Sequence, residues 1–376
     1  MNRRSFLRNG LGLGGAALVA PAMVSNVMAA EKELNLYSWA DYITEDMLKA
    51  FEKETGIRVN LTTYGSNDEA LNKLRASKGK GFDVVMPSVT YGPAWYKHRL
   101  LQPIDTSKIN VAGCVSSMWE ASKGFGGEHR GKRYIAPFNW GTEAITVNTE
   151  KHPDVKPNEI SYGDLWKEDL AAQVTARAHS VIIGTGLYLD RIGKVKSNRM
   201  LDTYKDEKTM KEIYSKITDF IIKNKKNIRQ FWSNAQETTN AFTQNGCTIG
   251  QTWDGPAMRM MSESKGKIKF MAPKEGAITW MDGMAITKGA KNISASYAWI
   301  NWYYNGGKAG ALHANATGYN SCALGTANYL SDQSKANFKS AYPGDAIKNL
   351  WWYPSEPVWF VSARNEFRDK LLAAGI

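Results

Sequence analysis

Tryptophan and aspartate stand close together at three widely separated places in this chain of 376 residues. The three pairs are Trp39 with Asp41, Trp253 with Asp254, and Trp280 with Asp282. An aromatic face attracts a cation, and a buried carboxylate needs a charged or hydrogen-bonding partner. Core packing explains one such pair easily, but three of them together indicate a site for a small cationic group.

The first pair follows a predicted strand. Polar and apolar residues alternate over 33–37, which predicts a strand, and the apolar spacing over 44–54 predicts a helix. Trp39, Asp41 and Tyr42 therefore lie in the loop after the carboxyl end of the strand. Ligands bind at this end of the strands in open α/β sheets, so the loop is a candidate binding site.

The next segments continue the same alternation. A strand is predicted at 58–63, a helix at 68–78 and a buried strand at 82–86, a βαβαβ order that favours a parallel sheet with right-handed crossovers. Ser88 follows the third strand. Its hydroxyl either faces a ligand or caps a helix that starts near Thr90.

The pattern changes after Gly141. The strand predicted at 144–148 has no helix close behind it, which indicates a crossing into a second lobe. The remaining predicted elements are helices at 180–192, 206–224, 237–244, 294–304, 308–316 and 358–373, and strands at 248–252 and 278–286.

We therefore expect a two-lobe α/β protein. Residues 31–142 and 279–376 form the first lobe in this division, and 143–278 form the second. The chain crosses between them near 141–149 and 276–280, and two crossings of this kind suit a cleft that closes on a ligand.

The first 30 residues are typical of an export signal. Arg3 and Arg4 precede an apolar run at 11–24, and small residues follow at 27–30. A twin-arginine signal that is removed on export predicts a periplasmic protein. Residues 10–15 match G-x-G-x-x-G but follow no strand, so we do not expect a dinucleotide site there.

The composition excludes several other classes. The formal charge of +12 is scattered along the chain without a recognisable nucleic-acid module, so we expect no nucleic-acid partner. Cys114, Cys247 and Cys322 lie far apart, as do the five histidines, and no C-x-x-C or H-x-x-x-H occurs. We expect neither a metal nor a cofactor, and we expect a monomer. Which cysteines pair, if any, stays open.

Five segments carry a resemblance to a known family, and they are 36–42, 82–88, 163–166, 279–282 and 317–319. On these segments the chain resembles the periplasmic spermidine/putrescine-binding proteins, the solute receptors of polyamine ABC importers. The resemblance implies the type II two-lobe fold of periplasmic binding proteins, no catalysis, and ABC permease subunits at the inner membrane as partners.

The resemblance also implies ligand-contacting positions, namely Trp39, Tyr42, Ser88, Trp253, Trp280, Asp282 and Tyr319. The chain departs from the family at 175–184, which contains no acid where family members usually grip one end of the polyamine. Arg177, His179 or Ser180 could instead receive an anionic group. A small cationic or zwitterionic ligand is expected. A betaine or dimethylsulfoniopropionate-like zwitterion is preferred, taurine or an ω-amino acid comes next, and putrescine or spermidine is the alternative.

Two other functions remain to be weighed. Asp41, Asp254 and Asp282 could serve as acid and base in a hydrolase, as in glycoside hydrolysis, although no G-x-S-x-G or metal spacing supports an enzyme. A sensor subunit that passes ligand binding to a receptor would use the same fold.

Overall fold

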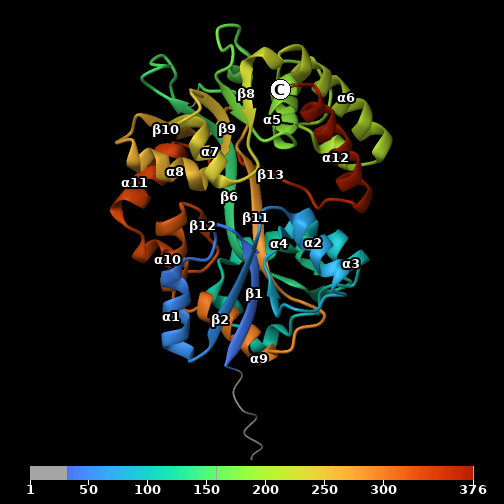
Figure 1. The fold of residues 1–376 in the computed structure, drawn as a ribbon, viewed down its shortest axis with the longest axis vertical. Coiled ribbons are helices and arrows are strands. Elements are labelled where there is room, and N and C mark those ends of the chain that lie inside the picture. Colours follow the sequence, from blue (N-terminus) through green and yellow to red (C-terminus); the bar gives the residue numbers. More distant parts are fainter. Residues whose placement is uncertain (1–31, 158, 376) are drawn as a thin grey trace, which may run out of the picture. The chain divides into compact units, whose positions relative to one another are not determined.

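The computed structural model describes residues 32–157 and 159–375 (Figure 1). The predicted export signal therefore lies outside the described residues. Among those that are described, no helix has the length and apolar character needed to cross a membrane. Cys114, Cys247 and Cys322 are buried and not in disulfides.

The amino-terminal part follows the predicted βαβαβ order. It contains β1 (Glu33–Trp39), α1 (Glu45–Thr55), β2 (Arg58–Tyr64), α2 (Asn67–Ala76) and β3 (Val84–Val85). Strand β1 pairs in parallel with both β2 and β3, which confirms the parallel arrangement. The hydroxyls of Thr44 and Ser66 cap the two helices by accepting backbone N–H groups at 3.3 and 3.2 Å.

One mixed sheet joins both halves of the protein, in the order β2-β1-β3-β11-β6-β9-β7-β8. Its other members are β6 (Ile135–Asn148), β7 (Val174–Ala176), β8 (Ile228–Phe231), β9 (Ile249–Trp253) and β11 (Ile278–Ile286). Figure 1 shows β6 and β11 running side by side from β1 and β2 toward β8 and β9. These two antiparallel strands carry the chain between the lobes.

Strand β6 begins nine residues before the predicted strand at 144–148, at Ile135. Pro137 and Gly141 concealed it, because both residues are typical of strand ends. The register against β11 shifts between Asp282 and Gly283, and this bulge accommodates Pro137 opposite Gly283.

The helices and short strands cover this sheet. The helices are α3 (Gly92–Lys97), α4 (Ser116–Ser122), α5 (Ser180–Arg191), α6 (Glu207–Lys223), α7 (Ala235–Thr243), α8 (Asp254–Glu263), α9 (Ile293–Tyr303), α10 (Lys308–Thr317), α11 (Asp332–Ala341) and α12 (Val358–Ala373). The short strands are β4 (Glu128–His129), β5 (Lys132–Arg133), β10 (Ile268–Met271), β12 (Asn320–Ser321) and β13 (Trp351–Trp352). The predicted helices are confirmed to within two residues at each end, whereas α4, α8 and α11 were not predicted.

Two large hydrophobic cores correspond to the two lobes. The first core contains Leu36, Phe51 and Trp299, and the second contains Ile182 and Tyr214. This arrangement is the two-lobe α/β fold that the sequence predicted.

The carboxyl-terminal helix departs from the predicted division, which gave 279–376 to the first lobe. Helix α12 packs against α6, and its Phe360 and Leu371 belong to the second core beside Tyr214. The periodicity of α12 predicted a helix but contained no information about which core it covers. The boundary residues of the lobes stay a prediction.

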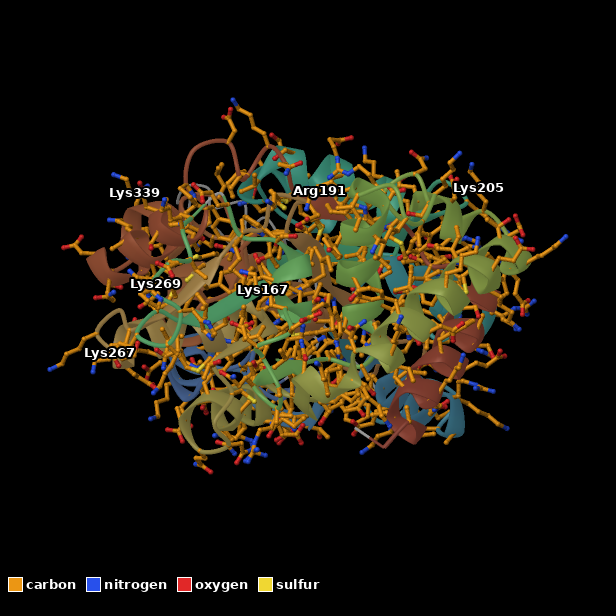
Figure 2. The ribbon with its side chains drawn as sticks, turned by 90° about the horizontal axis from the view of Figure 1, so that it is seen from above. Lys167, Arg191, Lys205, Lys267, Lys269 and Lys339 are labelled. Atoms are coloured by element: carbon orange, nitrogen blue, oxygen red, sulfur yellow. The ribbon has the colours of Figure 1, made fainter. Side chains whose placement is uncertain are left out.

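Basic side chains are spread over the surface. Figure 2 shows Lys205, Lys267 and Lys339 at separate places on one face, with their side chains directed outward. All three residues are exposed. A distribution of this kind is consistent with solvated surface charge.

Candidate ligand-binding site

A cavity of about 180 Å³ collects side chains from the ends of several strands. Nine of the ten predicted site residues line it, namely Trp39, Asp41, Tyr42, Ser88, Arg177, Trp253, Trp280, Asp282 and Tyr319. They come from segments up to 280 residues apart in the chain, and the sheet order brings them together.

Four aromatic side chains form one wall, which we call the aromatic box: Trp39, Tyr42, Trp280 and Tyr319. The Tyr42 ring lies 6.4 Å from that of Trp280, nearly parallel to it, and 5.4 Å from that of Tyr319. The Trp39 ring is 6.1 Å from Tyr42. Faces at these separations suit a positively charged group between or beside them.

Asp282 lies in the middle of β11, next to the aromatic box, and is only 2% exposed. The Tyr42 hydroxyl donates to its Oδ2 at 2.5 Å. Its other oxygen, Oδ1, is buried and has no hydrogen-bond partner within the described residues. Burial raises the pKa of Asp282 to about 7, although the Tyr42 hydrogen bond, the nearby Ser88 hydroxyl and the Arg177 guanidinium act in the opposite direction.

Asp41 is a second carboxylate beside the box. The Tyr319 hydroxyl donates to its Oδ2 at 3.0 Å, which ties the β1–α1 loop to the segment before β12. Burial raises the pKa of Asp41 as well, while Tyr319 and the Arg259 guanidinium lower it. Burial disfavours the ionised form of both carboxyl groups, and a cation in the cavity would stabilise that form in each.

Ser88 lines the cavity at the end of β3. It occupies the position before the 3₁₀ turn Val89–Tyr91, but its hydroxyl makes no cap hydrogen bond. The hydroxyl oxygen accepts instead from Asn67 Nδ2 at 2.9 Å, and the Asn67 Oδ1 accepts from the Ser88 amide at 3.0 Å. The Ser88 hydroxyl therefore does not cap a helix, and Ser88 lines the cavity.

Arg177 follows β7 and reaches the cavity beside Trp253. Its guanidinium carbon is 4.7 Å from the centre of the Trp253 ring and 5.8 Å from that of Trp232. The guanidinium has no hydrogen bond or ion pair in the part of the chain that the structure describes. Glu143 lies close enough for an electrostatic interaction that favours the charged form of Arg177.

The two other predicted anion-binding residues are less suited to that role. Ser180 is fully buried, and its hydroxyl donates to Glu143 Oε1. His179 lines the cavity, but burial and the nearby Arg177 guanidinium hold its pKa well below the usual range, so the imidazole is neutral. Arg177 is therefore the stronger anion-binding candidate of the three.

Asp254 was predicted to line the site, but the structure gives it another place. It is fully buried at the start of α8, where Thr142 and Gly255 donate backbone N–H groups to it at 2.9 and 3.0 Å. The Tyr342 hydroxyl donates at 3.2 Å. Its carboxyl group thus joins α8 to β6 and to the end of α11, and it is not among the residues that line the cavity.

Several lining residues were not predicted. Glu143 lies within β6, in the stretch hidden by Gly141; burial raises its pKa to about 7, and Gln251 donates to its Oε1 at 3.1 Å. Asp68 follows the carboxyl end of β2, and the rule used for Trp39 would have found it. Arg364 lies in α12 and Glu356 lies just before it. The sequence predicted this segment as part of the first lobe and gave no pattern that connected it with the site.

The unpredicted charges largely compensate one another. Arg364 Nη1 lies 2.9 Å from Glu356 Oε2. Arg364 and Arg368 each approach Asp68 Oδ2 to 4.0 Å, and Asn365 donates to the same oxygen at 3.2 Å. This group links α2 to α12 across the cavity.

A two-lobe α/β fold with an aromatic and acidic cavity at the strand ends defines a type II solute-binding protein. The chain belongs to the family of bacterial extracellular solute-binding proteins, whose model matches residues 46–340. It is 30% identical over 344 residues to the spermidine/putrescine-binding periplasmic protein of Escherichia coli, covering 89% of this chain and 91% of that protein.

Other relatives agree with this assignment. A putrescine/agmatine-binding protein of Pseudomonas aeruginosa is 25% identical and covers 78% of this chain and 79% of its own length. The solved structure of a spermidine/putrescine ABC transporter substrate-binding protein from Streptococcus pneumoniae superposes with a TM-score of 0.70 at 26% identity. It covers 92% of this chain and 99% of the pneumococcal chain.

Proposed function

We propose that this protein is the substrate-binding component of a periplasmic ABC importer and captures a small protonated alkylamine without changing it chemically. Putrescine and spermidine belong to this class, and the names of the relatives make them the first ligands to test. The predicted export signal at 1–30 agrees with a periplasmic location.

The observation that carries the proposal is the unpartnered Asp282 Oδ1 beside the aromatic box. A buried carboxylate oxygen without a donor is costly, and an ammonium N–H that binds it would recover that cost. The rings of Trp39, Tyr42 and Trp280 would stabilise the same positive charge.

The same observation changes the preferred ligand. Betaines and sulfonium compounds carry no N–H, so they would leave Asp282 Oδ1 without a donor. A primary ammonium can donate up to three hydrogen bonds. The relatives' names therefore favour the polyamine alternative, and the orphan oxygen favours any ligand with an ammonium N–H, over the onium zwitterion that the sequence suggested.

Capture requires movement of the two lobes. In the proposed cycle the ligand first binds the side that carries Asp282 and Trp280, and bending of β6 and β11 then brings Arg177 and Trp253 over it. Closure excludes water, and the lower local polarity strengthens each contact with the cation. The closed form would then be recognised by the permease.

A thermal-shift screen followed by titration calorimetry tests the proposal, using the mature protein with putrescine, spermidine and glycine betaine. A ligand at a hundred times its Kd adds about 2.7 kcal/mol to the stability of the folded state. We expect amines to raise the melting temperature and glycine betaine to leave it unchanged. Mass spectrometry should recover the amine intact, whereas turnover would indicate an enzyme. A protein that ignores every amine would contradict the proposal.

A further inference from the structure

The cavity carries unlike charges at two places that aromatic rings separate. Asp282 and Asp41 stand at the aromatic box, and neither has an ion pair among the described residues. The Arg177 guanidinium lies over the Trp253 ring, and the centre of that ring is 6.5 Å from that of Trp39. Neighbouring rings of Tyr42, Trp39 and Trp253 therefore connect the acidic end of the cavity, at Asp282, with the basic end, at Arg177.

The other charged side chains do not change this asymmetry. Asp68 and Glu356 are matched by Arg364 and Arg368, and His179 is neutral. Glu143 is the remaining acid near Arg177 and favours its charged form, but its Oε1 accepts hydrogen bonds from Ser180 and Gln251 and none from the guanidinium.

The guanidinium of Arg177 has few partners among the described residues. A guanidinium has five N–H donors. In the described part of the chain the Arg177 guanidinium lies near Glu143 and against the rings of Trp253 and Trp232, but it makes no hydrogen bond or ion pair. Its planar donor fork matches a carboxylate, which can accept two parallel hydrogen bonds. A second ammonium at this place would face a like charge.

We infer that Arg177 binds the carboxylate of a ligand whose other end is the ammonium held at Asp282, so that the ligand is an ω-amino acid. The inference rests on the proposed function for its amine end and narrows the class of solute at the other end. A polyamine would satisfy Asp282 and be repelled at Arg177, whereas an ω-amino acid satisfies both.

Three probes of similar length separate these possibilities: putrescine, 5-aminopentanoate and N-acetylputrescine. Each has a primary ammonium at the end of a four-carbon chain, and they differ only in the group at the far end. Titration calorimetry of the mature protein should give the tightest binding for 5-aminopentanoate, by about tenfold or more over putrescine. Binding of N-acetylputrescine should fall between them, because its neutral carbonyl accepts only ordinary hydrogen bonds from Arg177.

Arg177→Gln provides the decisive variant, and Arg229→Gln is its matched control because Arg229 is an exposed arginine on β8. We expect Arg177→Gln to weaken 5-aminopentanoate by roughly 10- to 100-fold and to leave putrescine unchanged or tighter. Arg229→Gln should resemble the wild type for all three probes. Thermal unfolding of both variants checks that each is folded.

The outcomes separate this inference from the proposed function. Tight putrescine binding with no response to 5-aminopentanoate would overturn the role of Arg177 and keep the amine-binding function. Equal losses of 5-aminopentanoate and putrescine in Arg177→Gln would show that Arg177 supports the cavity wall rather than a carboxylate. Failure of every amine to bind would overturn both.

Discussion

Asp254 and Asp282 look alike in the sequence and differ completely in the folded protein. Each is buried beside a tryptophan, and burial raises the pKa of both, to about 8 for Asp254 and about 7 for Asp282. Asp254 accepts two backbone N–H groups and a tyrosine hydroxyl, whereas Asp282 keeps one oxygen without a partner beside a cavity. A buried carboxylate thus indicates a ligand site only when the protein leaves part of it unsatisfied.

The sharpest test of this comparison is Asp282→Asn. The substitution keeps the shape of the side chain and removes the charge that pairs with the ligand ammonium. We expect affinity for putrescine or 5-aminopentanoate, whichever binds tighter, to fall by roughly 100-fold, because a buried ion pair loses one partner. Titration calorimetry measures the loss.

A neutral probe serves as the control for Asp282→Asn. The uncharged analogue 1-pentanol lacks the ammonium, so its weak binding should not respond to the substitution. Equal losses for charged and uncharged probes would assign Asp282 a structural role like that of Asp254.

The pH dependence of binding should follow Asp282. Its pKa is raised to about 7, so the apo carboxyl group is ionised above that pH and protonated below it. A protonated carboxyl cannot pair with an ammonium, and affinity should fall by up to roughly tenfold for each pH unit below about 7. Calorimetry between pH 5.5 and 8.5 measures this, and Asp282→Asn should flatten the profile. A wild-type profile that is already flat would speak against Asp282 as the binding carboxylate.

Asp254→Ala should give the opposite signature. Removing the side chain leaves the Thr142 and Gly255 amides without their acceptor, and we expect a loss of roughly 1–3 kcal/mol in the free energy of unfolding. Urea unfolding measures the loss, and calorimetry should show ligand affinity within about twofold of the wild type. A large affinity loss at unchanged stability would place Asp254 in the binding site after all.

Trp280→Ala should have the smallest of these effects. The substitution removes one face of the aromatic box while leaving Asp282 in place. We expect roughly a 3- to 30-fold loss of affinity for the amine, the range of a partly desolvated cation–π contact. Trp299, buried in the first core away from the cavity lining, provides a contrast: Trp299→Ala should lower stability and spare affinity. Unchanged affinity in Trp280→Ala would remove Trp280 from the site.

Local patterns were sufficient for much of the fold. The alternation at 33–37 and the helical spacing at 358–373 correspond to β1 and α12 because side-chain periodicity follows directly from backbone geometry. These patterns missed the first part of β6, which contains Pro137 and Gly141, because both residue types are typical of strand ends. The strand tolerates them because its bulge and its close contacts need those residues.

The sequence by itself determined the residue types of the site, since Trp39, Tyr42, Ser88, Trp280 and Asp282 follow or occupy strands that periodicity predicts. Only the tertiary structure decided which carboxylates have hydrogen-bond partners for both oxygens, as Asp254 does, and which keep an oxygen without a partner, as Asp282 does. Satisfaction depends on donors that come from distant segments, such as Tyr342 for Asp254 and Tyr42 for Asp282. Spacing along the chain carries no record of those contacts, because the packing of the two lobes creates them.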